Sequence, residues 1–146
     1  MIGTVKITKI PRSYNEKMVR CVSRWVGRDQ SETVTKEGRA RLAVFFPPSH
    51  LRINTRQVVP FHELLIAKCE QGVKGNPTPK FEWRLNGRSI GNGNEIGIGN
   101  SIEYKVGKED HLKKLECIAI HTTFQDAKEI RVRKERQIRV ECKYFF

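Results

Sequence analysis

The sequence predicts an all-β fold in which antiparallel strands pack as a sandwich. Three observations lead to this prediction: short runs with apolar residues at every second position, turns rich in glycine and proline between those runs, and two cysteines and a tryptophan on the apolar side of the runs. Side chains on a strand point alternately to its two faces, so such runs indicate strands with one buried face. Apolar residues form 38% of the 146 residues, which permits a core.

The first strand expected in this core ends near Cys69. Leu65, Ala67 and Cys69 occupy alternate positions, which turns the cysteine towards a core. Residues 70–79 then contain two glycines and two prolines. Proline cannot donate a ladder hydrogen bond and glycine relaxes the backbone, so we expect a turn there.

Trp83 lies in the cleanest period-two run of the chain. Phe81, Trp83 and Leu85 alternate with charged residues, so we expect the indole to face inward. Asn86-Gly87 ends the run with a dipeptide typical of type I′ hairpin turns, in which both central residues need positive φ.

Two further half-buried strands are expected after the glycine-rich stretch 87–99. That stretch lacks any phosphate-loop pattern, and we expect a flexible connection across the sheet edge. The apolar positions of the two strands are Ile102, Tyr104 and Val106 in the first, and Leu115, Cys117 and Ala119 in the second.

Together these residues resemble the C2/I-set domains of immunoglobulin-superfamily adhesion proteins, particularly the nephrin-like type. The motifs that carry the resemblance are Cys69, Gly75-Asn76-Pro77-Thr78-Pro79, Phe81-Glu82-Trp83-Arg84-Leu85-Asn86-Gly87, Glu109-Asp110 and Cys117. The resemblance covers residues 48–146 and implies a complete immunoglobulin-like sandwich, with a Cys69–Cys117 disulfide and Trp83 as the core pin beside it. Such domains usually carry tyrosine two residues before the second cysteine. Leu115 stands there, and we expect it to fill the corner by packing alone.

Residues 1–47 are interpreted as the end of an earlier copy of the same unit. Cys21 lies 96 residues before Cys117, about the length of one such domain. The interpretation places strand E at Val5 and Ile7, strand F over 19–25 and strand G over 40–46 of a truncated domain. Because three strands cannot close a sandwich, we expect this segment to be poorly ordered or to drive aggregation.

Two cysteines remain outside the expected pair. We expect Cys21 to have lost its partner by truncation, and Cys142 to be a buried thiol on strand G. A Cys21–Cys142 bridge is the alternative. Zinc binding is disfavoured because no Cys-x-x-Cys pattern or Cys/His cluster with ligand spacing occurs.

The net charge of +12 raises the expectation of an anionic partner. Within segment 128–143 several basic residues alternate with apolar ones, as in a strand that presents one charged face to water. Binding of heparan-sulfate-like glycans is the second interpretation, with these candidate contacts: Arg131, Arg133, Lys134, Arg136 and Arg139. Nucleic-acid binding is not expected, because no recognised module or aromatic stacking platform accompanies the charge.

A protein interface is predicted on the outward faces of two strands. Arg84, Ile118 and Ile120 alternate away from the expected core, and contiguous exposed isoleucines often mark an interface. Two other interpretations stay open: a neighbouring loop covers the isoleucines, or the domain is a spacer between adhesive domains.

The resemblance therefore implies a non-catalytic extracellular recognition module, a fragment of a cell-adhesion or receptor-like immunoglobulin-superfamily protein. The resemblance implies homophilic or heterophilic partners of the same superfamily. No catalytic motif appears and no cofactor is expected. The chain shows no signal peptide or membrane span, so we expect it to be part of a larger membrane protein at the cell surface. The alternative is an intracellular structural I-set domain of the giant muscle type, with its thiols reduced.

Overall fold

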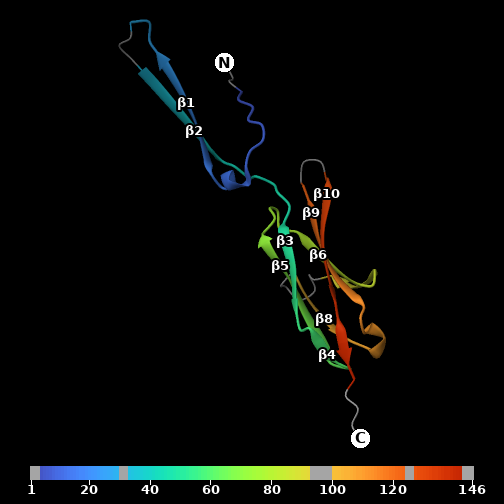
Figure 1. Cartoon of the computed structure of the whole chain (residues 1–146). Helices are drawn as coiled ribbons and strands as arrows, with labels where there is room; N and C mark the ends of the chain where they lie inside the picture. The colour runs from blue at the N-terminus through green and yellow to red at the C-terminus, as the bar shows by residue number, and fades with distance from the viewer. Residues whose placement is uncertain (1–3, 30–32, 93–99, 124–126, 143–146) are drawn as a thin grey trace. The chain divides into compact units, whose positions relative to one another are not determined.

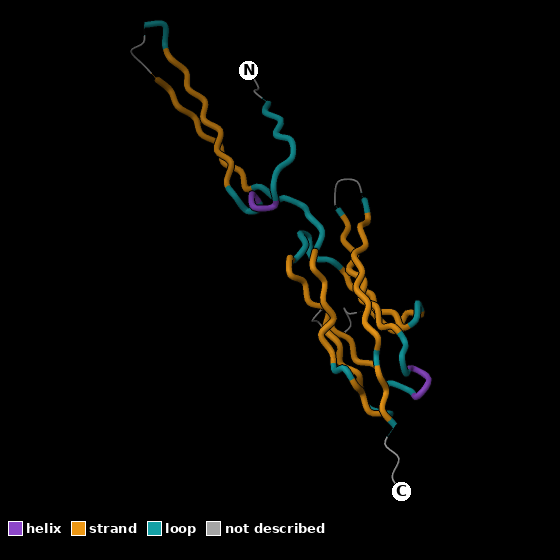
Figure 2. Tube along the Cα trace, viewed as in Figure 1, coloured by secondary structure: helices purple, strands orange, loops and turns teal. Residues whose placement is uncertain are grey.

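The chain divides into two units, residues 1–45 and 46–146. The computed structural model describes residues 4–29, 33–92, 100–123 and 127–142 (Figures 1 and 2). Strands dominate both units within these ranges, which also contain two short helical turns of the 3-10 type: η1 (Arg12–Tyr14) in the first unit and η2 (Lys108–Asp110) in the second.

The second unit is an immunoglobulin-like sandwich of two antiparallel sheets (Figure 1). One sheet has the order β3 (Ser49–Thr55), β5 (Leu64–Val73), β8 (Ser101–Lys105). The other has the order β10 (Glu129–Gln137), β9 (Lys114–Thr122), β6 (Lys80–Leu85), β7 (Arg88–Asn92). A short parallel pair, β4 (Val58–Pro60) with β11 (Arg139–Glu141), lies beside them. The predicted all-β sandwich is confirmed.

The predicted alternation produces the core between the two sheets. On β5, Leu65, Ala67 and Cys69 are buried, whereas Leu64 and Ile66 are exposed. The expected inward residues of β6 and β9 are buried as well, as is Ile102 on β8. Period-two patterning therefore identified the buried face of β5, β6, β8 and β9.

A disulfide crosses the core between Cys69 on β5 and Cys117 on β9, with Cα atoms 6.3 Å apart. Trp83 lies directly opposite Cys117 in the register of β6 and β9, and its side chain is fully buried. The cysteines and the indole thus belong to one apolar cluster that joins both sheets. A disulfide between the sheets with a buried tryptophan beside it is a hallmark of this fold.

The turn after β6 forms as predicted, but the segment after it differs from the prediction. Asn86 and Gly87 have φ of 46° and 81°, the left-handed values that a type I′ hairpin needs. Arg88–Asn92 then forms β7, which pairs with β6 and is not part of a flexible connection. Residues 93–99 of the same predicted connection lie outside the described residues.

The prediction of a buried Cys142 is wrong. The final strand ends at Glu141, and Cys142 follows it as an exposed free thiol. The alternation that buries Ile138 and Val140 therefore does not continue to the next even position. Cys21 is also a free, exposed thiol, so the described structure contains no Cys21–Cys142 bridge.

The first unit contains η1 and one antiparallel hairpin, β1 (Met18–Val26) with β2 (Thr33–Arg41) (Figure 2). Every residue of both strands is exposed. The expected strand E at Val5 and Ile7 does not form, and the final strand covers 33–41 instead of 40–46. Among the described residues of the second unit β8 pairs only with β5, and the described part of the first unit has no strand in the position of β5. A strand at Val5 and Ile7 would correspond to β8 and would need such a partner, so residues 4–10 have no described strand with which to pair.

Candidate recognition surface

The outer face of β6, β9 and β10 carries a network of charged side chains over apolar ones. Ile118 on β9 lies between Glu82 on β6 and Arg133 on β10, and Ile120 lies beside Arg131. We call this surface the arginine face, and it consists of Glu82, Arg84, Glu116, Ile118, Ile120, Arg131 and Arg133.

Ion pairs hold the three arginines of this face. The Nε atom of Arg84 donates to Oε1 of Glu82 over 2.8 Å, and Nη1 of Arg131 lies 3.5 Å from Oε2 of the same carboxylate. Nη1 of Arg133 lies 4.0 Å from Oε1 of Glu116. The two carboxylate side chains are only 17% and 19% exposed, whereas the arginines are 30–59% exposed. The acids therefore lie beneath the guanidinium groups that they orient.

The electrostatics of Glu82 follow from this position. The hydrogen bond from Arg84 lowers the pKa of Glu82 below its usual range, with the charges of Arg84 and Arg131 acting in the same direction and partial burial opposing them. Glu82 therefore keeps its negative charge, and its hold on both arginines, into acidic solution.

The predicted pair of exposed isoleucines is wrong. Ile118 has no exposed surface and Ile120 is half-buried. Both isoleucines lie on the expected face of β9, the one that points away from the core. Long charged side chains on the neighbouring strands enclose Ile118, a covering that alternation within one strand does not reveal.

The five basic residues considered for glycan contact do not lie on one surface. Arg131 and Arg133 belong to the arginine face, but Lys134 and Arg136 alternate to the opposite side of β10. Nη1 of Arg136 donates to the carbonyl of Ile53 on the other sheet, over 3.3 Å. Arg139 lies beyond them on β11. Only the first two therefore lie on the same sheet face as the predicted interface residue Arg84.

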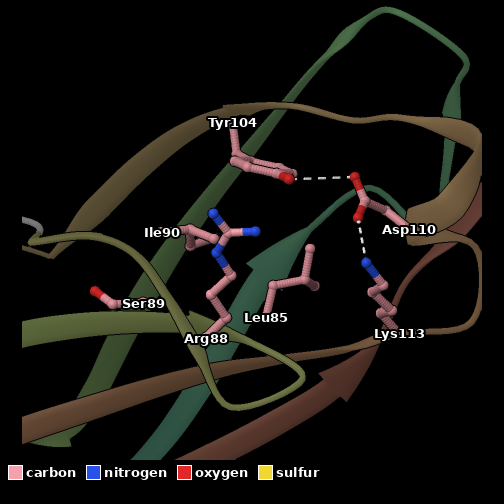
Figure 3. Close-up of a pocket in the computed structure, with 7 residues that line it drawn as sticks. All are labelled: Leu85, Arg88, Ser89, Ile90, Tyr104, Asp110 and Lys113. Atoms are coloured by element: carbon pink, nitrogen blue, oxygen red, sulfur yellow. Dashed lines mark hydrogen bonds and ion pairs between the residues drawn. The ribbon is translucent and has the colours of Figure 1, made fainter.

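Asp110 is a buried polar centre that the sequence motifs did not single out as a site. Its carboxylate accepts hydrogen bonds from Lys113 Nζ at 2.9 Å and from the Tyr104 hydroxyl at 3.3 Å (Figure 3). It accepts a third from Gly107 N at 2.9 Å. The three donors are Tyr104 on β8, Gly107 immediately before η2 and Lys113 immediately before β9. Spacing alone could not have found them, because two are side chains in unrelated positions and one is a backbone amide.

The same carboxylate lines a pocket of about 250 Å³ between β7 and β8. Burial alone would raise the pKa of Asp110, but the Gly107 amide, Lys113 and Tyr104 outweigh it, and the pKa lies below its usual range. Burial and the charge of Asp110 in turn raise the pKa of Tyr104. The three hydrogen bonds to Asp110 tie the turn before β9 to β8.

Leu115 occupies the corner position as predicted. Its side chain has no exposed surface and belongs to the core cluster. A leucine has no hydroxyl to tie down the corner, and the Asp110 cluster five residues earlier supplies polar contacts in that region.

The described residues contain neither a helix long and apolar enough to cross a membrane nor a group of three or more metal-ligating side chains. The candidate surface is the outer face of a β-sheet and carries ion-paired charged side chains.

Comparison with known proteins adds little to this description. No protein-family model matches the chain, and no curated protein does. A solved structure described as tandem Ig repeats of Dlar is similar, with 14% sequence identity, 87% of this chain and 82% of that chain covered, and a TM-score of 0.40. A likeness this distant carries no argument. The assignment of the second unit as an immunoglobulin-like sandwich rests on its own sheets, its disulfide and its buried tryptophan.

Proposed function

We propose that the second unit is a non-catalytic extracellular recognition module that binds protein partners through the arginine face. The observation that carries the proposal is the set of three partly exposed arginines, each of which lies within 4.0 Å of a more deeply placed carboxylate, Glu82 or Glu116. Arg131 also pairs with the more exposed Glu129 on its own strand, over 2.6 Å. Arginine is enriched at protein interfaces, and a side chain that is already held loses less conformational entropy on binding. The face is therefore prepared to contact a complementary acidic surface.

The partner class that fits is another cell-surface protein of the immunoglobulin superfamily, bound homophilically or heterophilically. The Cys69–Cys117 disulfide supports an oxidising compartment, because such bonds are rare where thiols are kept reduced. We place the module in a larger adhesion or receptor-like membrane protein of the nephrin-like C2/I-set type.

Charge reversal tests this function. A fluorescent tetramer of the full chain should bind intact cells of the source tissue, and Arg84→Glu with Arg131→Glu should reduce that binding at least tenfold. Arg52→Glu on the outer side of β3 is the matched control, since this exposed arginine lies on the other sheet. Binding that is equally weakened by the control, or unaffected by the double reversal, would overturn the proposal.

A second ligand class, heparan-sulfate-like glycans, is supported by Lys134 and Arg139. Neither forms an ion pair with any of the residues that the structure describes. Heparin affinity chromatography separates the two classes. Glycan binding predicts elution at clearly higher salt than a size-matched basic control protein, and heparinase treatment of the cells should then abolish tetramer binding. Elution with the control would exclude this ligand class.

A further inference from the structure

The first unit repeats, element by element, the part of the second unit that carries Cys117. The elements η1, β1 and β2 begin at residues 12, 18 and 33, and η2, β9 and β10 begin at residues 108, 114 and 129. Each pair has the same length and is separated by 96 residues. Cys21 therefore occupies on β1 the position of Cys117 on β9.

The hydrogen bonds repeat as well. Glu16 N donates to Leu42 O over 2.9 Å, and at the matching position Leu112 N donates to Ile138 O over 2.9 Å. The residues that donate these two bonds, Glu16 and Leu112, both have a left-handed backbone, with φ of 65° and 62°. Further along, a side chain in each turn accepts from a backbone amide: Asn15 Oδ1 from Val44 N at 2.9 Å, and His111 Nδ1 from Val140 N at 3.2 Å. The turn and hairpin thus have the same local geometry in both units.

One face of the first hairpin matches the buried face of the second. We call it the cysteine face, and it consists of Val19, Cys21, Ser23, Trp25, Val34, Lys36, Gly38 and Ala40, which share a side in the register. The counterparts of Val19, Cys21 and Ser23 in the second unit, which are Leu115, Cys117 and Ala119, are fully buried. On the cysteine face, by contrast, Trp25 is 62% exposed. A Cβ atom built on Gly38, opposite Cys21, would meet nothing within 4 Å. The space above the cysteine is open.

We infer that the cysteine face is a docking surface for a β-sheet that carries a cysteine on an alternating apolar strand. The second unit identifies this occupant by its chemistry. There the matching face is covered by β3, β5 and β8, and Cys69, which follows the buried Leu65 and Ala67 on the same face of β5, bonds to Cys117. Cys21 would form the equivalent disulfide, in which two thiols each lose a proton and an electron to the oxidising glutathione couple of the compartment.

A graft supplies this occupant. Residues 46–106, placed directly before Pro11 in place of residues 1–10, would set the grafted cysteine 48 residues before Cys21, the separation found between Cys69 and Cys117. After refolding in a glutathione buffer and alkylation, peptide mapping should link Cys21 to the grafted cysteine. Val19→Asp should reduce that linkage at least fivefold, and Val26→Asp should not, because Val26 faces the other side of the same strand. An alkylated Cys21 beside an intact Cys69–Cys117 bond, or a Cys21–Cys21 link between two copies, would overturn the inference.

If the graft does not fold, the unaltered full chain provides a second test of whether the cysteine face binds the β5 sequence. It is incubated in the same buffer with a peptide of residues 64–73, the sequence of β5, and separately with a scrambled peptide of equal composition. We expect the β5 peptide to modify Cys21 several-fold faster than the exposed Cys142, and the scrambled peptide to show no such preference. Equal preference for the two peptides would contradict the inference.

Discussion

Asp110 determines how the chain enters β9. Only 2% of its surface is exposed, yet its carboxylate is satisfied by one backbone and two side-chain donors. A buried charge is tolerated when hydrogen bonds replace its lost hydration. The single residue therefore joins the end of β8, the turn η2 and the first residues before β9.

Asp110→Asn should lower the free energy of unfolding by about 1–3 kcal/mol at pH 7, because an amide accepts these bonds less well and loses its attraction to Lys113. The pKa of Asp110 is depressed in the folded state, so its stabilisation is complete above the unfolded value of about 3.9 and is lost as the pH falls through the folded value. Denaturant unfolding at pH 7 and at successively lower pH should show the difference between the two proteins shrinking. Glu109→Gln, an exposed neighbour in η2, serves as the control and should change little. A difference that is constant across this pH range would contradict the account.

Alternation within strands made the residue-level core predictable, and contacts between strands explain the exceptions. Cys69, Trp83 and Cys117 were placed correctly because each lies in a clear period-two run. Ile118 was predicted exposed, but its cross-strand neighbours enclose it. Asp110 attracted no attention as a site, since its donors have no sequence spacing in common.

At the scale of elements, the two hairpins show how the same local geometry can be buried or exposed. The hairpin β9–β10 is part of a four-stranded sheet with a second sheet over it, whereas β1–β2 is a two-stranded ribbon with every residue exposed. An isolated hairpin is marginally stable in water, because it buries little apolar surface. The repeat itself was only partly predictable: the aligned segments 11–44 and 107–140 share three residues, Lys17, Cys21 and Val44 with their counterparts Lys113, Cys117 and Val140.

Hydrogen exchange should separate the two hairpins. We expect the amides of β1 and β2 to exchange at least a hundredfold faster than those of β6 and β9, because opening the first hairpin exposes almost no additional apolar surface. Exchange measured by mass spectrometry on the monomeric full chain at pH 7 checks this. Strong protection throughout residues 18–41 would contradict the marginal stability of the hairpin.

A second prediction at the scale of elements concerns the arginine face on β6, β9 and β10. Glu82→Gln should reduce partner binding several-fold while changing the free energy of unfolding by less than about 1 kcal/mol, because partly exposed ion pairs contribute little to stability. Binding by the tetramer assay and chemical denaturation measure the two effects on the same variant. Glu103→Gln, on the exposed outer side of β8, is the control. A loss of stability that matches the loss of binding would mean that Glu82 acts structurally.

At the scale of the whole molecule, the fold could be predicted from sequence because its strongest signals are long-range constraints within one sandwich. The disulfide closes a loop of 48 residues and the indole fills the space beside it. The edges were less predictable: β7 forms within a glycine-rich stretch through its hairpin with β6, and the last strand stops one residue before Cys142. Pairing partners decide such segments, and local composition does not identify those partners.

Removing the disulfide should destabilise the second unit as a whole. Cys69→Ala with Cys117→Ala is expected to lower the free energy of unfolding by about 4 kcal/mol, the value that the chain-entropy model gives for a loop of this length. Chemical denaturation followed by Trp83 fluorescence measures the change, with Cys142→Ala as a control that should leave stability unaltered. An unchanged midpoint in the double variant would contradict the role of the disulfide.

The most direct test of the central claim, a disulfide-pinned recognition module of an oxidising compartment, is cysteine mapping on protein taken from its native compartment. The chain is alkylated without reduction, digested and analysed by mass spectrometry. The account predicts a linked pair of peptides containing Cys69 and Cys117. Alkylation of both as free thiols would contradict it and would favour a reduced intracellular domain.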